Sequence, residues 1–171
     1  MSAEAEALRL EARSSLAGIP AAAWNALVGP DDPFLEHEFL AALEDSGVVG
    51  EGTSWVPRHV LVWRGDRLVG AVPFYLRWDS YGEYIFDWSW AQAAARSRVR
   101  YYPKLTCAVP FTPATGPRLL LHPSLRGTHR GDVRRALLRG ARGLQPLGQQ
   151  LDAGQVLRQQ PQAQHVHQVA A

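Results

Sequence analysis

The sequence predicts a mixed α/β fold, because two helical segments precede a β-hairpin and further short strands and helices follow it. The 171 residues are enough for one ordinary domain, and contents of 46% hydrophobic and 20% charged residues lie near globular averages. Every aromatic residue lies at or before Phe111, so the later part of the chain lacks the rings that help to fill a core. We therefore place the main compositional boundary near Leu121.

Two helices are expected in the first third of the chain. Residues 20–28 form the first, with Pro20 at its first position and Gly29-Pro30 after its end. Residues 34–46 form the second, which Asp31-Asp32-Pro33 caps and Gly47 terminates. The predicted buried face of this helix consists of Leu35, Phe39, Ala42 and Leu43. Residues 1–18 are rich in Ala, Glu and Arg, and we expect a flexible segment that is frayed or loosely helical.

The clearest strand pattern is an antiparallel hairpin. Residues 57–63 form one strand, residues 64–67 the turn, and residues 68–77 the returning strand. Pro73 has no N–H to donate to a ladder, so it is expected at an edge or a bulge.

Shorter elements follow the hairpin, and the chain ends in a Gln-rich tail. We expect helices over residues 87–97 and 131–144, and strands over residues 104–109 and 118–121. The resulting organisation is a flexible N-terminus over residues 1–18, one domain over 19–144 and a disordered, low-complexity tail over 145–171.

The stretch from Trp78 to Leu121 has the most unusual composition. It holds nine of the sixteen aromatic residues together with the only lysine, Lys104, and the only cysteine, Cys107. Pro and Gly residues that fix loop shapes are interleaved with these rings. Such a stretch fits either a ligand groove or an ordinary core edge at which Tyr keeps its hydroxyl in water.

Glu83 and Asp87 are the candidate acid–base pair of this stretch. Their spacing of four residues places both carboxylates on one side if the following helix begins early. One of them then serves as general base, with Tyr81, Tyr84 or Tyr102 as acid. The alternative for Asp87 is a helix cap before Trp88. Lys104 either pairs with Glu83 or binds a substrate carboxylate. The rings expected to converge on one concavity are Tyr81, Tyr84, Trp88, Tyr101 and Tyr102.

Four strings in this region carry a family resemblance. They are SYGEYIFDWSW (80–90), YYPKLTCAVPFTPATGPRLL (101–120), DPFLEHEFLAALE (32–44) and PRHV (57–60). Over Pro33 to Leu121 the chain resembles bacterial proteins described as GNAT-family N-acetyltransferases or as peptidoglycan biosynthesis/recognition proteins, which are similar to FemAB-type aminoacyl transferases. The typical family chain is longer and continues into a second acyltransferase-like half. The resemblance therefore implies a GNAT-like acyltransferase fold that is incomplete here.

The resemblance also implies a reaction and its partners. The expected activity is N-acetyl or aminoacyl transfer to an amine-bearing peptide or cell-wall precursor, with acyl-CoA (acetyl-CoA) or aminoacyl-tRNA as donor. We assign catalysis to Glu83, Asp87, Tyr84 and Tyr102, and substrate binding to Tyr81, Trp88, Tyr101 and Lys104. The alternatives are a non-catalytic recognition module and a truncated, inactive product.

Acyl transfer also needs a cradle for the donor's phosphates. The GNAT-type pattern, Gln/Arg-x-x-Gly-x-Gly/Ala between a strand and a helix, fits residues 126–131 except that His129 replaces the middle Gly. The predicted cofactor-binding residues are Arg126, Gly127, Arg130 and Gly131, and the alternative is an Arg-rich loop. A side chain at His129 obstructs the approach of phosphates to the backbone.

The composition also predicts whether the protein spans a membrane, is exported or binds nucleic acid. No apolar run is long enough to span a bilayer, the N-terminus lacks a signal-peptide core, and one cysteine forms no internal disulfide, so we expect a cytoplasmic protein. Residues 1–117 carry ten basic and fourteen acidic side chains (−4), whereas residues 118–171 carry eight and two (+6). The Arg-rich part and the rings are largely segregated, which predicts no sequence-specific nucleic-acid readout and at most weak RNA binding.

No metal site is predicted. His165 and His167 are too few ligands. Cys107 is expected to be a buried, inert thiol, and His37 and His59 are expected to be structural.

Overall fold

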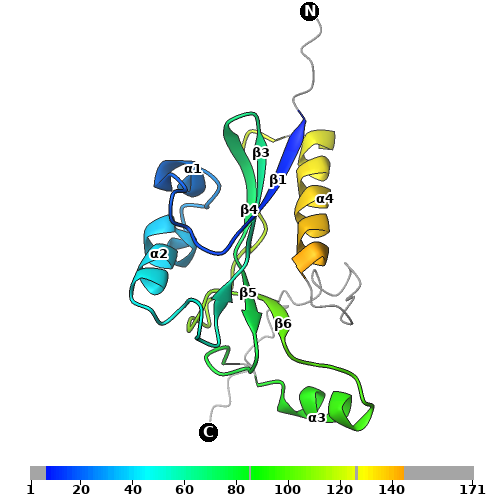
Figure 1. Cartoon of the computed structure of the whole chain (residues 1–171). Coiled ribbons are helices and arrows are strands. Elements are labelled where there is room, and N and C mark those ends of the chain that lie inside the picture. The colour runs from blue at the N-terminus through cyan, green and yellow to red at the C-terminus, as the bar shows by residue number, and fades with distance from the viewer. Residues whose placement is uncertain (1–6, 85, 126, 145–171) are drawn as a thin grey trace, which may run out of the picture.

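The computed structural model describes residues 7–84, 86–125 and 127–144, which form two small antiparallel sheets with helices around them (Figure 1). The larger sheet has the strand order β1-β3-β4-β7 and the smaller one β2-β5-β6. The elements are β1 (Leu8–Arg13), α1 (Ala21–Asn25), η1 (Pro33–Leu35), α2 (His37–Asp45), β2 (Val56–Pro57), β3 (His59–Arg64), β4 (Arg67–Val72), β5 (Phe74–Arg77), α3 (Trp88–Arg96), β6 (Lys104–Cys107), β7 (Leu120–Leu121) and α4 (Gly127–Leu144). A mixed α/β fold is thereby confirmed.

The predicted hairpin forms, and both of its strands pass from one sheet to the other. One strand is interrupted at Arg58, between β2 and β3, and the other at Pro73, between β4 and β5. The Arg58 N–H donates to the Phe74 carbonyl at 2.8 Å, so the two interruptions lie side by side. Pro73 thus stands at the break between ladders, where its missing N–H leaves no gap in the pairing.

Alternation along β3 divides the core into two layers. Val60 and Val62 pack with the apolar face of α4, whereas Leu61 packs with Trp24 of α1 and the residues around α2. Figure 1 shows α1 and α2 on one side of the larger sheet and α4 on the other. The sheet therefore has both faces covered, and the smaller sheet extends beyond this core.

Three expectations about helices and ends are corrected. Residues 8–13 are not frayed or helical but form β1, which pairs antiparallel with β3 from Leu8↔Arg64 to Arg13↔His59. The second helix is split into η1 and α2, and its fully buried residues are Leu35 and Leu40, whereas Ala42 is exposed. α4 begins at Gly127 instead of residue 131. The predicted tail over 145–171 lies outside the described residues.

Close packing of α4 on the sheet gives a first prediction. A Cβ at Gly140 would lie 2.6 Å from Val60 Cγ1 and 3.1 Å from Leu10 Cδ1, whereas a Cβ at Gly143 meets nothing within 4 Å. Both Gly→Ala changes gain the same helix propensity. We expect Gly140→Ala to give a free energy of unfolding about 1–3 kcal/mol below that of Gly143→Ala, because only the first overpacks the interface. Urea unfolding of both variants measures this difference, and equal stabilities would contradict the packing.

Candidate functional site

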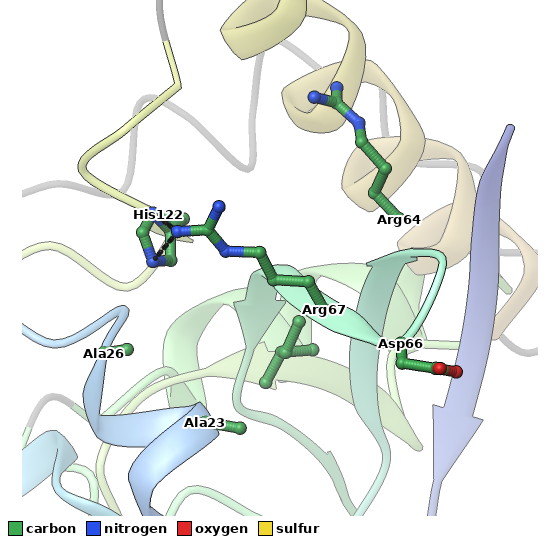
Figure 2. A pocket seen from close by; sticks show the side chains of 7 residues that line it. Ala23, Ala26, Arg64, Asp66, Arg67 and His122 are labelled. Carbon is green, nitrogen blue, oxygen red and sulfur yellow. Dashed lines mark hydrogen bonds between the residues drawn. The ribbon is translucent and has the colours of Figure 1, made fainter. Parts of the chain in front are cut away.

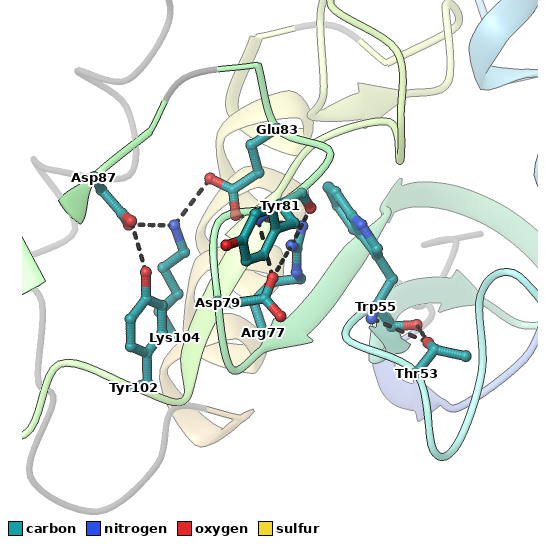
Figure 3. A network of polar contacts seen from close by, with 9 residues as sticks. All are labelled: Thr53, Trp55, Arg77, Asp79, Tyr81, Glu83, Asp87, Tyr102 and Lys104. Atoms are coloured by element: carbon teal, nitrogen blue, oxygen red, sulfur yellow. Dashed lines mark hydrogen bonds and ion pairs between the residues drawn. The ribbon is translucent and has the colours of Figure 1, made fainter.

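The register of the smaller sheet places two cationic residues side by side at its end. Arg77, the last residue of β5, is paired with Lys104, the first residue of β6. The loop between β5 and α3 then brings three carboxylates, those of Asp79, Glu83 and Asp87, against these two cations (Figure 3). We call these five residues the Lys104 network.

Lys104 joins the two predicted catalytic carboxylates. Its Nζ lies 2.9 Å from Glu83 Oε2 and 2.5 Å from Asp87 Oδ2. Glu83 and Asp87 have side chains that are each only 12% exposed. The predicted Lys104–Glu83 pair is thus confirmed, and Asp87 is added to it.

Asp87 receives more hydrogen bonds than any other carboxylate of the network. Tyr102 donates its hydroxyl to Asp87 Oδ1 at 2.6 Å, and Tyr101 donates to Oδ2 at 2.9 Å. Burial raises the pKa of Asp87, but the hydrogen bonds from Lys104 and the two tyrosines lower it by a larger amount. The resulting pKa is about 2. Burial and the bond to Asp87 raise the pKa of Tyr102 to about 12 and that of Tyr101 well above its usual range.

These shifts predict an acid-dependent loss of stability. Because the folded-state pKa of Asp87 lies below its unfolded value of 3.8, its stabilising contribution is complete above about pH 4 and is lost as the pH falls towards 2. We expect Asp87→Asn to be less stable than the wild type at neutral pH, and the difference to shrink in that window. Chemical unfolding at a series of pH values tests this. A difference that stays constant down to pH 2 would contradict the network.

Arg77 was not anticipated from the sequence. Its side chain is fully buried, and its guanidinium lies over the Trp55 ring, 3.5 Å from the ring centroid. Its Nη2 donates to Asp79 Oδ1 at 2.9 Å and to the Tyr81 carbonyl at 2.5 Å, and Nη1 lies 3.3 Å from Glu83 Oε1. The available signal was an Arg at the end of an otherwise apolar strand, next to a loop with acidic residues.

Gly82 allows the loop to lie against this cation–ring pair. It has a φ of +80°, and a Cβ there would lie 2.7 Å from Phe111 Cδ1 and 3.2 Å from Trp55 Nε1. A residue with a side chain meets both a strained backbone and a clash at this position. Gly82 thereby holds Glu83 close enough to reach Lys104.

The predicted rings are distributed over two environments. Tyr101 and Tyr102 contact each other edge to face and bind Asp87. Tyr81, Tyr84 and Trp88 are instead 65%, 61% and 58% exposed. Asp87 occupies the predicted N-cap position of α3, but its side chain makes no capping hydrogen bond and binds Lys104 and the two tyrosines instead.

An open depression of about 550 Å³ lies elsewhere, between α1 and the β3–β4 turn (Figure 2). In it, Arg67 Nη2 lies 2.9 Å from His122 Nε2. Its lining residues are Ala23, Ala26, Arg64, Asp66, Arg67, Leu68 and His122. None of the predicted site residues belongs to this depression.

The predicted phosphate cradle is not a loop. Gly127, Arg130 and Gly131 all lie in the first turns of α4, and Arg126 lies outside the described residues. A Cβ at Gly131 would meet only the Arg135 side chain, at 3.5 Å, so no close approach requires a glycine there. Figure 1 places the start of α4 beside the β3–β4 turn, at the opposite end of the molecule from β6 and α3. The structure therefore does not bring the predicted cradle to the Lys104 network.

His59 and Cys107, which were expected from the sequence to be structural, lie inside the fold. His59 is fully buried, and its Nε2 lies 3.0 Å from Glu44 Oε1. Cys107 is half-buried on β6, and burial raises the pKa of its thiol to about 12. Within the described residues, no group of three or more His, Cys, Asp or Glu side chains is arranged to hold a metal ion.

Comparison with known proteins places the chain in a family but finds no individual relative. A family model named FemAB-like and described as peptidoglycan biosynthesis/recognition matches residues 15–168. Neither the curated proteins nor the solved structures contain a match. The model covers both core layers, the Lys104 network and α3.

Proposed function

This chain belongs to the FemAB-like family of peptidoglycan biosynthesis/recognition, and on that premise we propose that it binds an amine-bearing peptide of a cell-wall precursor at the Lys104 network. The family description supplies the class of partner. The charge and the contacts of the network support the amine as the group of that partner which is bound.

One observation carries the proposal: three carboxylates face two cations. Asp79, Glu83 and Asp87 outnumber Arg77 and Lys104, which leaves one negative charge among partly buried groups. At reduced dielectric an excess charge of this kind favours a ligand of opposite sign. An ammonium group compensates it, whereas a carboxylate increases it.

Glu83 offers the acceptor for this amine. Its Oε2 is used by Lys104, but its Oε1 is buried and accepts no hydrogen bond, although Arg77 Nη1 lies 3.3 Å away. A buried acceptor without a donor is costly, and a donor from a ligand removes that cost. We assign the amine contact to Glu83 Oε1, with the exposed rings of Tyr81 and Tyr84 beside it on the same loop.

The titration behaviour of the network favours recognition over proton transfer. A carboxylate with a pKa of about 2, such as Asp87, is a poor base for an amine at neutral pH. A tyrosine with a pKa of about 12, such as Tyr102, is a poor acid. In this proposal Asp87, Tyr101 and Tyr102 position Lys104 and Glu83.

Acyl transfer is the second candidate, because the family description also names biosynthesis. Glu83 is then the general base, and acyl-CoA or aminoacyl-tRNA is the donor. The start of α4 lies away from the network, and His129 occupies the position of a cradle glycine. We expect this chain to bind acetyl-CoA weakly, to lose that binding at physiological salt and to transfer no acetyl group. Titration calorimetry at two salt concentrations tests this, and tight, salt-resistant binding would favour the enzyme.

The test of recognition uses a cell-wall stem peptide with a free side-chain amine and the same peptide acetylated on that amine. We expect the free-amine form alone to bind measurably in titration calorimetry. Glu83→Gln is expected to weaken binding at least about tenfold, as for loss of a charged hydrogen bond. Glu51→Gln, on an exposed loop with a side chain 79% exposed, is the matched control. Equal binding of both peptides, or equal affinities of the two variants, would overturn the proposal.

A further inference from the structure

The surface of α3 differs from that of the other long helices. None of its nine residues is buried, although two of them are tryptophans. Trp88 and Trp90 are 58% and 71% exposed, and Phe86, 54% exposed, stacks on Trp88 with ring centroids 4.7 Å apart. Figure 1 shows α3 standing apart from both sheets at one end of the molecule. Three large rings in a contiguous segment thus face solvent.

The helix is amphipathic even though no protein core covers it. Ser89, Gln92 and Arg96 follow one another at spacings of three and four, which gathers its polar side chains in one stripe. The two tryptophans and the alanines occupy the rest of the circumference. A helix with a wide apolar face and a basic polar stripe suits the boundary between water and lipid.

The charge around α3 is positive. No Asp or Glu occurs between Asp87 and Asp132 in the sequence, whereas Arg96 and Arg98 lie at the end of the helix and are exposed. The nearest preceding carboxylates, Glu83 and Asp87, are turned onto Lys104. Within the described part of the chain, the exposed rings are therefore accompanied by Arg96 and Arg98, and neither of them forms an ion pair with a carboxylate there.

The backbone conformation of Arg98 places its positive charge next to the end of the helix. It has a φ of 56°, and the N–H groups of Arg98 and Val99 donate to the carbonyls of Ala95 and Ala94. This is a Schellman termination, whose left-handed position normally carries Gly. An arginine in the place of the favoured glycine adds a cation at the edge of the apolar face.

We propose that α3, together with Phe86 and Arg98, docks on the surface of a bilayer that contains anionic lipid. The tryptophans lie at the level of the headgroups, where their rings are buried and their indole N–H groups remain hydrated. The arginines contact lipid phosphates. Among the described residues no helix is long and apolar enough to cross a membrane.

Charge also argues against a second copy of the chain as the occupant. In a two-fold symmetric contact between two α3 helices, the same patch meets itself. Arg96 and Arg98 of one copy would then lie close to those of the other, and residues 88–131 contain no Asp or Glu to compensate them. An anionic lipid surface provides the missing complement. This inference does not depend on the proposed peptide recognition.

The experiment is co-sedimentation of the full 171-residue chain with vesicles. One set contains phosphatidylcholine alone and the other equal parts of phosphatidylcholine and phosphatidylglycerol. We expect binding to the second set only, and a decrease as salt is raised. Trp88→Ser/Trp90→Ser is expected to abolish binding. Arg96→Gln/Arg98→Gly is expected to weaken it about 25-fold, and the glycine preserves the helix termination.

Arg139→Gln/Arg142→Gln is the matched control, since it removes two exposed positive charges from α4. It is expected to bind vesicles like the wild type, and all variants are expected to keep the wild-type melting temperature, because every substituted side chain is exposed. Three results would overturn the proposal: no binding to anionic vesicles, equal losses in the two arginine variants, or sedimentation equilibrium showing self-association that Trp88→Ser/Trp90→Ser abolishes.

Discussion

Replacing Arg77 by leucine is expected to lower the free energy of unfolding by about 3–5 kcal/mol, the range for removing one partner of a buried ion pair. The guanidinium is fully buried, so its loss removes the counter-charge of Asp79, leaves Glu83 with Lys104 alone and takes the cation away from the Trp55 ring. Leucine fills part of the volume but supplies neither the positive charge nor the hydrogen-bond donors. Urea or thermal unfolding measures the effect.

Two further variants show which property of Arg77 matters. Arg77→Lys keeps the charge but loses the planar contact with Trp55 and the forked donation to Asp79 and Tyr81, so an intermediate loss is expected. Arg135→Ala removes an exposed pair, with Asp132, and is expected to cost no more than about 1 kcal/mol. If Arg77→Leu cost as little as the exposed control, Arg77 would not hold the loop in place.

The fold was predictable where local pattern and tertiary structure agree. The hairpin was found because apolar residues and a Gly-Asp turn mark it, and Pro73 indicated where its ladder ends. β1 was missed because an Ala/Glu/Arg-rich segment has helical propensity. Its pairing with β3 is a tertiary effect that overrides this preference.

The candidate site was predictable in three of its members, Glu83, Asp87 and Lys104, and only partly in its arrangement. The interleaving of Glu83, Asp87 and Lys104 with rings indicated that these groups meet, and they do. Their meeting results from the pairing of β5 with β6, which no short-range pattern reveals. For the same reason the burial of Arg77 on Trp55, residues 22 positions apart in the chain, lay beyond the sequence.

Replacing Glu44 by alanine is the second large effect, with an expected loss of roughly 2–4 kcal/mol. Glu44 of α2 accepts hydrogen bonds from Ser15 Oγ at 2.7 Å and from the Leu16 N–H at 2.9 Å, and its Oε1 lies 3.0 Å from His59 Nε2. One carboxylate thus ties α2 to the segment after β1 and to β3. Alanine leaves these groups without their acceptor in a buried place.

The hydrogen bonds of Glu44 also predict how the stability of the protein changes with pH. Burial raises the pKa of Glu44, but the bonds from His59, Ser15 and Leu16 lower it by more, so the net shift is downward. The contribution of Glu44 is therefore complete above its unfolded pKa and is lost as the pH falls through the folded value. The stability difference between wild type and Glu44→Ala should shrink in acid, as unfolding at several pH values would show.

Glu51→Ala is the control, because the Glu51 side chain is 79% exposed. This variant should show neither the loss of stability nor the pH dependence. If both variants behaved alike, the joining role of Glu44 would have to be abandoned.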